Sequence, residues 1–344
     1  MIILLFLLVS LVLLCGRYRI SKNSLVNETS KTMFHFYAIV ILFFLTCFRY
    51  NVGYDYKNYY GHIIAPRSWG AQFFEFIPQQ ILLLARYFHE PLIFFVLTNG
   101  TILILFLKEI YDESISPFES LIVFLSMFYL GTLSTVRQYL AVAIVFYGFR
   151  YVKERAFLKY LICVVLATLC HNSAVITITI YFIYNYFSVS FSLFCVCIGF
   201  VIGPKVMTIF FGIPIISAYQ NYIDSGFKAG GAKSQYLWYL IFFFSLVIFI
   251  LSSHKKSFGK LFSITSIGVV FPRLFGATMG GRMAIYFYVF YILLVPCLFT
   301  ELKPVYFRKF YLVPFYLYYV LFLLTDADHD KGYTNYVLYF FKEN

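Results

Sequence analysis

Charged residues are scarce in this chain of 344 residues: they make up only 12% of it, whereas hydrophobic residues make up 62%. A soluble globular domain has about a quarter charged residues, so a soluble fold is excluded along most of the length. Acidic residues are scarcer than basic ones, 15 against 27, which gives a net charge of +12. The basic residues form short clusters, typical of loops beside anionic lipid, and no run is long enough for a nucleic-acid-binding arm.

Metal-binding and redox motifs are also missing. The seven cysteines lie within apolar runs without zinc or redox spacing, so we interpret them as small buried residues. The six histidines are scattered, and no two have the spacing of a metal-ligand pair. We therefore expect neither a metal nor a cofactor. Repeats, low-complexity tracts and linkers are absent too, which predicts a single domain over residues 1–344.

The sequence is rich in apolar runs long enough, or nearly long enough, to cross a bilayer. With the basic loops placed in the cytoplasm, they predict an all-α polytopic integral membrane protein with about 12 transmembrane helices and both termini outside. The predicted helices are residues 1–15, 33–48, 91–107, 118–131, 138–149, 158–170, 174–187, 191–203, 236–251, 261–277, 284–299 and 310–325. The first run lacks a preceding basic segment and a cleavage site, which indicates a retained helix rather than a signal peptide.

Residues 70–89 do not fit a transmembrane helix, because polar residues such as Glu75, Gln79 and Arg86 interrupt the apolar ones. We predict an external amphipathic or re-entrant helix here. The later loops support this assignment. If residues 70–89 were a transmembrane helix, the basic residues of those loops would lie outside instead of in the cytoplasm. Two external loops follow from this topology, residues 49–90 and 204–235.

Several arginines would lie on the external side, where the positive-inside rule depletes them. They are Arg49, Arg67, Arg86, Arg137, Arg273 and Arg282. The guanidinium fork suits phosphate, so the group predicts an anionic ligand, although any single arginine could equally extend its charge to the interface. Arg282 follows two glycines, Gly280 and Gly281, which would allow close approach of a bulky head group.

Residues 135–174 form two apolar helices joined by a basic hairpin, which would bring Arg137 and His171 to the external face together. Imidazole changes protonation near neutral pH, so His171 is the first candidate for a general base. A structural role is the alternative, with the following Asn-Ser pair capping the next helix. Asp55 and Glu75 are the other candidates, although Asp55 could simply pair with Arg49.

Four motifs, in this order, resemble the EpsG family of Wzy-like polymerases of bacterial surface polysaccharides. They are RYNVGYDYKNYY (49–60), VRQYLA (136–141), HNSA (171–174) and GRMAIYF (281–287). The resemblance implies a glycosyltransferase of GT-C-like architecture in the bacterial cytoplasmic membrane, active on its periplasmic or external face. It would transfer a growing glycan from undecaprenyl pyrophosphate to the terminal sugar hydroxyl of another lipid-linked repeat unit. The donor is already activated, so no nucleotide-binding motif is required.

The resemblance also implies roles for particular residues. The candidates are His171, Asp55 and Glu75 for catalysis; Arg49, Arg137, Arg273 and Arg282 for pyrophosphate binding; and Tyr54, Tyr59 and Gln138 for sugar binding. The expected partners are an undecaprenyl-pyrophosphate-linked oligosaccharide, membrane lipids, a chain-length regulator and a flippase, and no nucleic acid. Two alternatives stay open: a polysaccharide ligase, and a flippase or transporter of lipid-linked sugars in which the arginines only bind.

Overall fold

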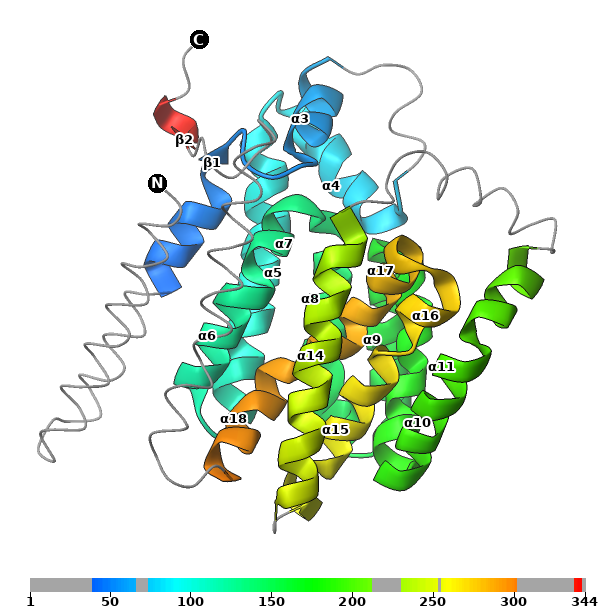
Figure 1. Ribbon diagram of the computed structural model, residues 1–344. Helices are drawn as coiled ribbons and strands as arrows, with labels where there is room; N and C mark the ends of the chain where they lie inside the picture. Colours follow the sequence, from blue (N-terminus) through cyan, green and yellow to red (C-terminus); the bar gives the residue numbers. More distant parts are fainter. Residues whose placement is uncertain (1–38, 66–73, 212–229, 253–254, 302–336, 342–344) are drawn as a thin grey trace, which may run out of the picture. The chain divides into compact units, whose positions relative to one another are not determined.

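The computed structural model describes residues 39–65, 74–211, 230–252, 255–301 and 337–341 (Figure 1). These residues are almost entirely helical, with one pair of two-residue strands. The predicted spans 1–15 and 310–325 lie outside the described residues. So does the start of the predicted span 33–48, of which residues 39–47 are helical.

The chain divides into two compact units. The first comprises Met1–Lys108, Pro117–Ala143 and Lys309–Asn344, and the second comprises Glu109–Ser116 and Ile144–Arg308. Two of the passages between the units fall within helices, α5 (Pro91–Glu113) and α8 (Val136–Lys153), and another falls between Ser116 and Pro117, where α6 begins. A single domain over the whole length stays a prediction.

The first unit holds the predicted external segment. A helix is observed near residues 70–89 as predicted, α4 (Phe76–Tyr87), which packs against α3 (Tyr56–Ile64), and its external position stays a prediction. The span predicted over 118–131 is instead broken, into α6 (Pro117–Met127) and α7 (Tyr129–Ser134). Strand β1 (Arg49–Tyr50) pairs antiparallel with β2 (Val337–Leu338), which leads into η3 (Tyr339–Phe341).

The second unit is a helical assembly in which several elements differ from the predicted spans. Its elements after α8 are α9 (Phe157–Cys170), η2 (Asn172–Thr177), α10 (Ile178–Tyr186), α11 (Val189–Phe211), α14 (Gly230–Leu251), α15 (Lys255–Gly268), α16 (Phe271–Phe275), α17 (Ala277–Tyr288) and α18 (Tyr291–Glu301). The predicted external loop 204–235 begins within α11 and ends within α14, and its external position stays a prediction. Both of its described ends are helical, and residues 212–229 lie outside the described residues.

Among the described residues, two helices are long and apolar enough to cross a membrane, Pro91–Glu113 and Phe258–Phe275. A third crossing results if Met279–Tyr288 and Tyr291–Thr300, which meet at a bend of 51°, form one span. The segment predicted as one helix over 284–299 is therefore bent and begins earlier. The remaining apolar helices searched are shorter, and the count of twelve stays a prediction. Together with the composition, these helices define a helical membrane protein.

Candidate functional site

Arg137 is the centre of a polar cluster in the first unit. It lies in the first turn of α8, and its Nη1 donates to Oε2 of Glu75 at 2.5 Å. Its Nε donates to the hydroxyl of Tyr59 at 3.3 Å, and its Cζ lies 4.6 Å from the ring centre of Phe74. Residues from α3, α8 and the segment leading into α4 thus converge on one guanidinium, which they hold in a defined orientation.

The cluster combines one guanidinium, one carboxylate and one phenol. Burial raises the pKa of Tyr59 to about 12, although Arg137 opposes the shift, so the phenol is neutral at neutral pH. The side chain of Glu75 is 9% exposed and that of Arg137 is 26% exposed. The third nitrogen of Arg137, Nη2, makes no hydrogen bond to another described residue. The arginine therefore keeps a donor and some exposed surface for a ligand.

Two members of the cluster were missed by the sequence analysis. The His62 ring packs edge-on against Phe74, with their centres 5.5 Å apart. His62 follows Asp55 and Tyr59 at the spacing of one helix face, so helical periodicity could have found it. Phe74 gives no such signal, because it is one of 44 phenylalanines.

Arg49, predicted to bind pyrophosphate, is fully buried. Its three nitrogens donate to the main-chain carbonyls of Thr46, Val52 and Leu133, at 2.6 to 3.1 Å. Its Cζ also lies 4.9 Å from the ring centre of Phe95. A guanidinium with no exposed surface is not open to a ligand in this structure, which fits a structural role for Arg49 better than the predicted one.

The loop that follows Arg49 packs tightly against the end of α7. Gly53 has a positive φ of 98°, and a Cβ there would lie 2.1 Å from the carbonyl oxygen of Leu133. Only glycine allows both the conformation and this approach. The amide of Tyr54 donates to Oγ of Ser134 at 3.2 Å. The loop thus supports the residues immediately before Arg137.

The three predicted sugar-binding residues differ in exposure. Tyr54 is 49% exposed, whereas Tyr59 and Gln138 are buried, at 2% and 6%. Of these three, Tyr54 offers an open ring to a ligand. Asp55, a predicted catalytic residue, precedes α3 and is half-buried.

His171 and Arg282 lie on packed neighbouring segments of the second unit. His171 is half-exposed and extended, between the end of α9 and η2, and η2 packs against α17. The hydroxyls of Ser173 and Tyr286 lie 3.2 Å apart, and Tyr286 follows Arg282 by one turn of α17. Neither η2 nor α10 has a side-chain cap, so the predicted capping role of the Asn-Ser pair is not observed.

Arg273 and the glycines before Arg282 have close helical neighbours in the same unit. Arg273 is exposed on α16, and a Cβ on Gly203 of α11 would lie 2.9 Å from its Cγ. A Cβ on Gly280 would lie 2.2 Å from the carbonyl oxygen of Phe271. Gly280 therefore allows α17 to pack closely on α16. A Cβ on Gly281 would meet only Nε2 of Gln235, at 3.9 Å, so the predicted approach of a head group to the glycine pair stays a prediction.

The predicted site residues divide between the two units. Arg137 and six others belong to the first unit, and His171, Arg273 and Arg282 belong to the second. The structure thus brings together Arg137, Glu75 and Tyr59, and separately the segments of His171 and Arg282. The predicted meeting of Arg137 with His171 stays a prediction.

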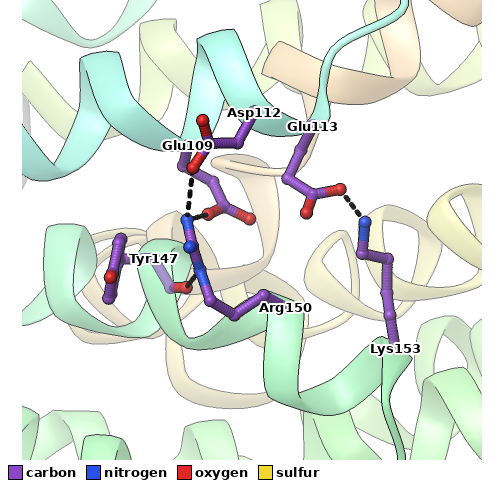
Figure 2. A network of polar contacts seen from close by, with 6 residues as sticks. All are labelled: Glu109, Asp112, Glu113, Tyr147, Arg150 and Lys153. Carbon is purple, nitrogen blue, oxygen red and sulfur yellow. Dashed lines mark hydrogen bonds and ion pairs between the residues drawn. The ribbon is translucent and has the colours of Figure 1, made fainter.

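A second polar cluster lies in the second unit and involves the basic hairpin (Figure 2). Arg150 of α8 donates from Nη2 to Glu109 at 2.8 Å and to Asp112 at 3.1 Å, and Lys153 pairs with Glu113. The side chain of Glu109 is fully buried. This cluster ties the end of α5 to α8 through ion pairs, although Oε1 of Glu109 is buried without a hydrogen-bond partner among the described residues. In the part of the chain that the structure describes, no group of three or more His, Cys, Asp or Glu is arranged to hold a metal ion.

The fold and the Arg137 cluster define a helical membrane protein with a half-buried cationic site. The EpsG family model matches residues 32–341, which is most of the chain, so the protein belongs to the EpsG family. This family is associated with glycosyltransferase-like polysaccharide polymerases. No curated protein and no solved structure matches the chain.

Proposed function

We propose that this protein polymerises oligosaccharide repeat units linked to undecaprenyl pyrophosphate, on the external face of the bacterial cytoplasmic membrane. The observation that carries the proposal is the Arg137 cluster, a half-buried guanidinium with an open nitrogen in a chain of this family. About twelve spans and a GT-C-like architecture belong to the same proposal. A chain-length regulator and a flippase are its proposed protein partners.

The reaction breaks the bond between the anomeric carbon of the donor and its pyrophosphate, and forms a bond from that carbon to the acceptor hydroxyl oxygen. Negative charge develops on the departing pyrophosphate, and Arg137 stabilises it. Glu75 orients Arg137 through the contact of 2.5 Å. Arg273 and Arg282 keep their predicted pyrophosphate-binding roles in this proposal, whereas Arg49 supports the loop instead of binding the ligand.

The acceptor hydroxyl must also lose a proton, and we propose His171 as the base that takes it. Glu75 is a weaker candidate, because its carboxylate already accepts from Nη1 of Arg137. Asp55, half-buried in the first unit, is the second candidate. The exposed ring of Tyr54 is the proposed stacking surface for a sugar of the acceptor.

The test is polymerisation by the purified protein in lipid nanodiscs, with a lipid-linked repeat unit as the only substrate. A ladder of longer glycans supports the proposal, and a substrate that stays monomeric contradicts it. A polysaccharide ligase would not lengthen the glycan in this assay, because the separate acceptor that it needs is not present. In cells, loss of a polymerase leaves single repeat units on the surface, whereas loss of a flippase leaves none.

A further inference from the structure

The last described residues of the chain, 337–341, form a C-terminal clasp on the loop that begins at Phe48. Strand β2 pairs with β1 (Figure 1), so that Arg49 is opposite Leu338 and Tyr50 is opposite Val337 in the register of the pair. The amide of Tyr339 then donates to the carbonyl oxygen of Phe48 at 2.7 Å. Main-chain hydrogen bonds therefore join two segments that are far apart in the sequence.

The side chain of Tyr339 ties this clasp to the beginning of α5. Its hydroxyl donates to Oε1 of Glu90 at 2.6 Å, and the same oxygen accepts the amide of Leu92 at 3.0 Å. Tyr339 is 7% exposed, and its ring packs against that of Tyr50, with centres 6.2 Å apart. A hydrogen bond from a buried hydroxyl to a carboxylate is stronger than one between neutral groups, so the clasp is anchored.

Hydrogen bonds continue from the clasp to the residues before Arg137. Arg49, in the strand that the clasp covers, donates to the carbonyl oxygen of Leu133 at 3.1 Å. Ser134 accepts from the amide of Tyr54 at 3.2 Å, and α8 begins two residues later. The contacts run from Tyr339 through β1 to the first turn of α8, all within the first unit.

We propose that Tyr339 is a positioning residue, which holds Arg137 where it meets the donor pyrophosphate by fixing the loop of Arg49. The proposal rests on the proposed function, because it takes the pyrophosphate as the ligand of Arg137. A misplacement of about 1 Å in a binding group can cost about 100-fold in rate, so the loop needs such a support. A purely structural role would instead change stability and leave donor affinity unchanged.

The first experiment measures the Kd of undecaprenyl pyrophosphate for the full-length protein in nanodiscs. Tyr339→Phe keeps the ring and loses the hydrogen bond to Glu90, so we expect the Kd to rise about tenfold. Glu90→Gln keeps an acceptor oxygen and should stay within about threefold of wild type, whereas Glu90→Leu should match Tyr339→Phe. Tyr87→Phe, at a tyrosine that is 79% exposed in the same unit, is the control and should leave the Kd unchanged.

The second experiment rescues the clasp with a covalent bond. Tyr50 and Val337 are directly paired in the strands, so cysteines at these positions fall within disulfide range. In a background without native cysteines, oxidation of this pair in Tyr339→Phe should restore the lower Kd, and reduction should reverse the effect. A wild-type Kd in Tyr339→Phe, or a disulfide that fails to form or to restore affinity, overturns the proposal. The readout here is binding and not polymerisation. Wild-type protein that binds undecaprenyl pyrophosphate but does not polymerise would therefore contradict the proposed function and leave the role of Tyr339 standing.

Discussion

Nη1 of Arg137 and Oε2 of Glu75 lie 2.5 Å apart, although 62 residues separate them in the sequence. The contact orients the guanidinium and partly neutralises it, while the rest of the side chain stays a quarter exposed. Such a pair differs from an exposed surface ion pair, because both partners are largely removed from water. The contact fixes the guanidinium within the protein, and its proposed role in binding pyrophosphate depends on this orientation.

Arg137→Lys keeps the charge but loses the planar fork, and lysine cannot contact Glu75 and Tyr59 in the same geometry. We expect polymerisation to fall about 100-fold or more, with normal membrane insertion. Glycan ladders from the purified variant measure the loss. Arg155→Lys, at an exposed arginine in the turn after α8, is the matched control. Equal activity of the two variants would remove Arg137 from the pyrophosphate site.

Glu75→Gln separates an orienting role from a catalytic one. The amide oxygen still accepts from Arg137, so we expect the variant to keep activity within about tenfold of wild type. Glu75→Ala removes the acceptor and should lose considerably more. Initial rates of chain growth at saturating donor measure both. If Glu75→Gln and Glu75→Ala are both folded and equally inactive, Glu75 is the base rather than the residue that orients Arg137.

His171→Gln should abolish chain growth while the lipid-linked donor still binds, because a base is needed for turnover and not for donor binding. Chain growth and donor Kd are measured on the same preparation. His89→Asn serves as the control, since His89 is exposed and has a φ of 51°, a conformation that asparagine tolerates. If chain growth persists in His171→Gln but stops in Asp55→Asn, the base is the carboxylate of Asp55 and not His171.

Arg150→Met should destabilise the protein strongly, because it leaves the fully buried carboxylate of Glu109 without its partner (Figure 2). Breaking a buried pair costs about 3–5 kcal/mol of the free energy of unfolding. Lys153→Met breaks the more exposed pair with Glu113 and should cost less than about 1 kcal/mol. Unfolding in a titration with denaturing detergent compares the two. Equal losses would mean that burial does not set the strength of these pairs.

The proposed topology places Asn58 outside and Glu154 in the cytoplasm. Both are exposed, one on α3 and the other in the turn between α8 and α9. In a background without native cysteines, a cysteine at position 58 should react with an impermeant maleimide on intact cells. One at position 154 should react only after permeabilisation. The reverse pattern would invert the topology and place the Arg137 cluster in the cytoplasm.

Elements that depend on local sequence were predicted well. The helix predicted over 158–170 is observed as Phe157–Cys170, and the segment with too many polar residues for a span contains α4. The bend after Tyr288 was not predicted, because the apolar residues continue on both sides of it and hydrophobicity carries no signal for a change of direction. Likewise, nothing local predicts that Arg49 is buried, since its carbonyl partner at Leu133 lies 84 residues away.

The sequence by itself determined that this is a helical membrane protein of the EpsG family, because the apolar runs and the motifs are properties of continuous stretches of chain. Only the tertiary structure decided which arginine is exposed: Arg49 is buried on main-chain carbonyls, whereas the side chain of Arg137 is partly exposed beside Glu75. The hydrogen bond from Tyr339 to Glu90 spans 249 residues. Such contacts depend on how distant segments pack against one another, and that information is spread over the whole chain rather than carried by any one motif.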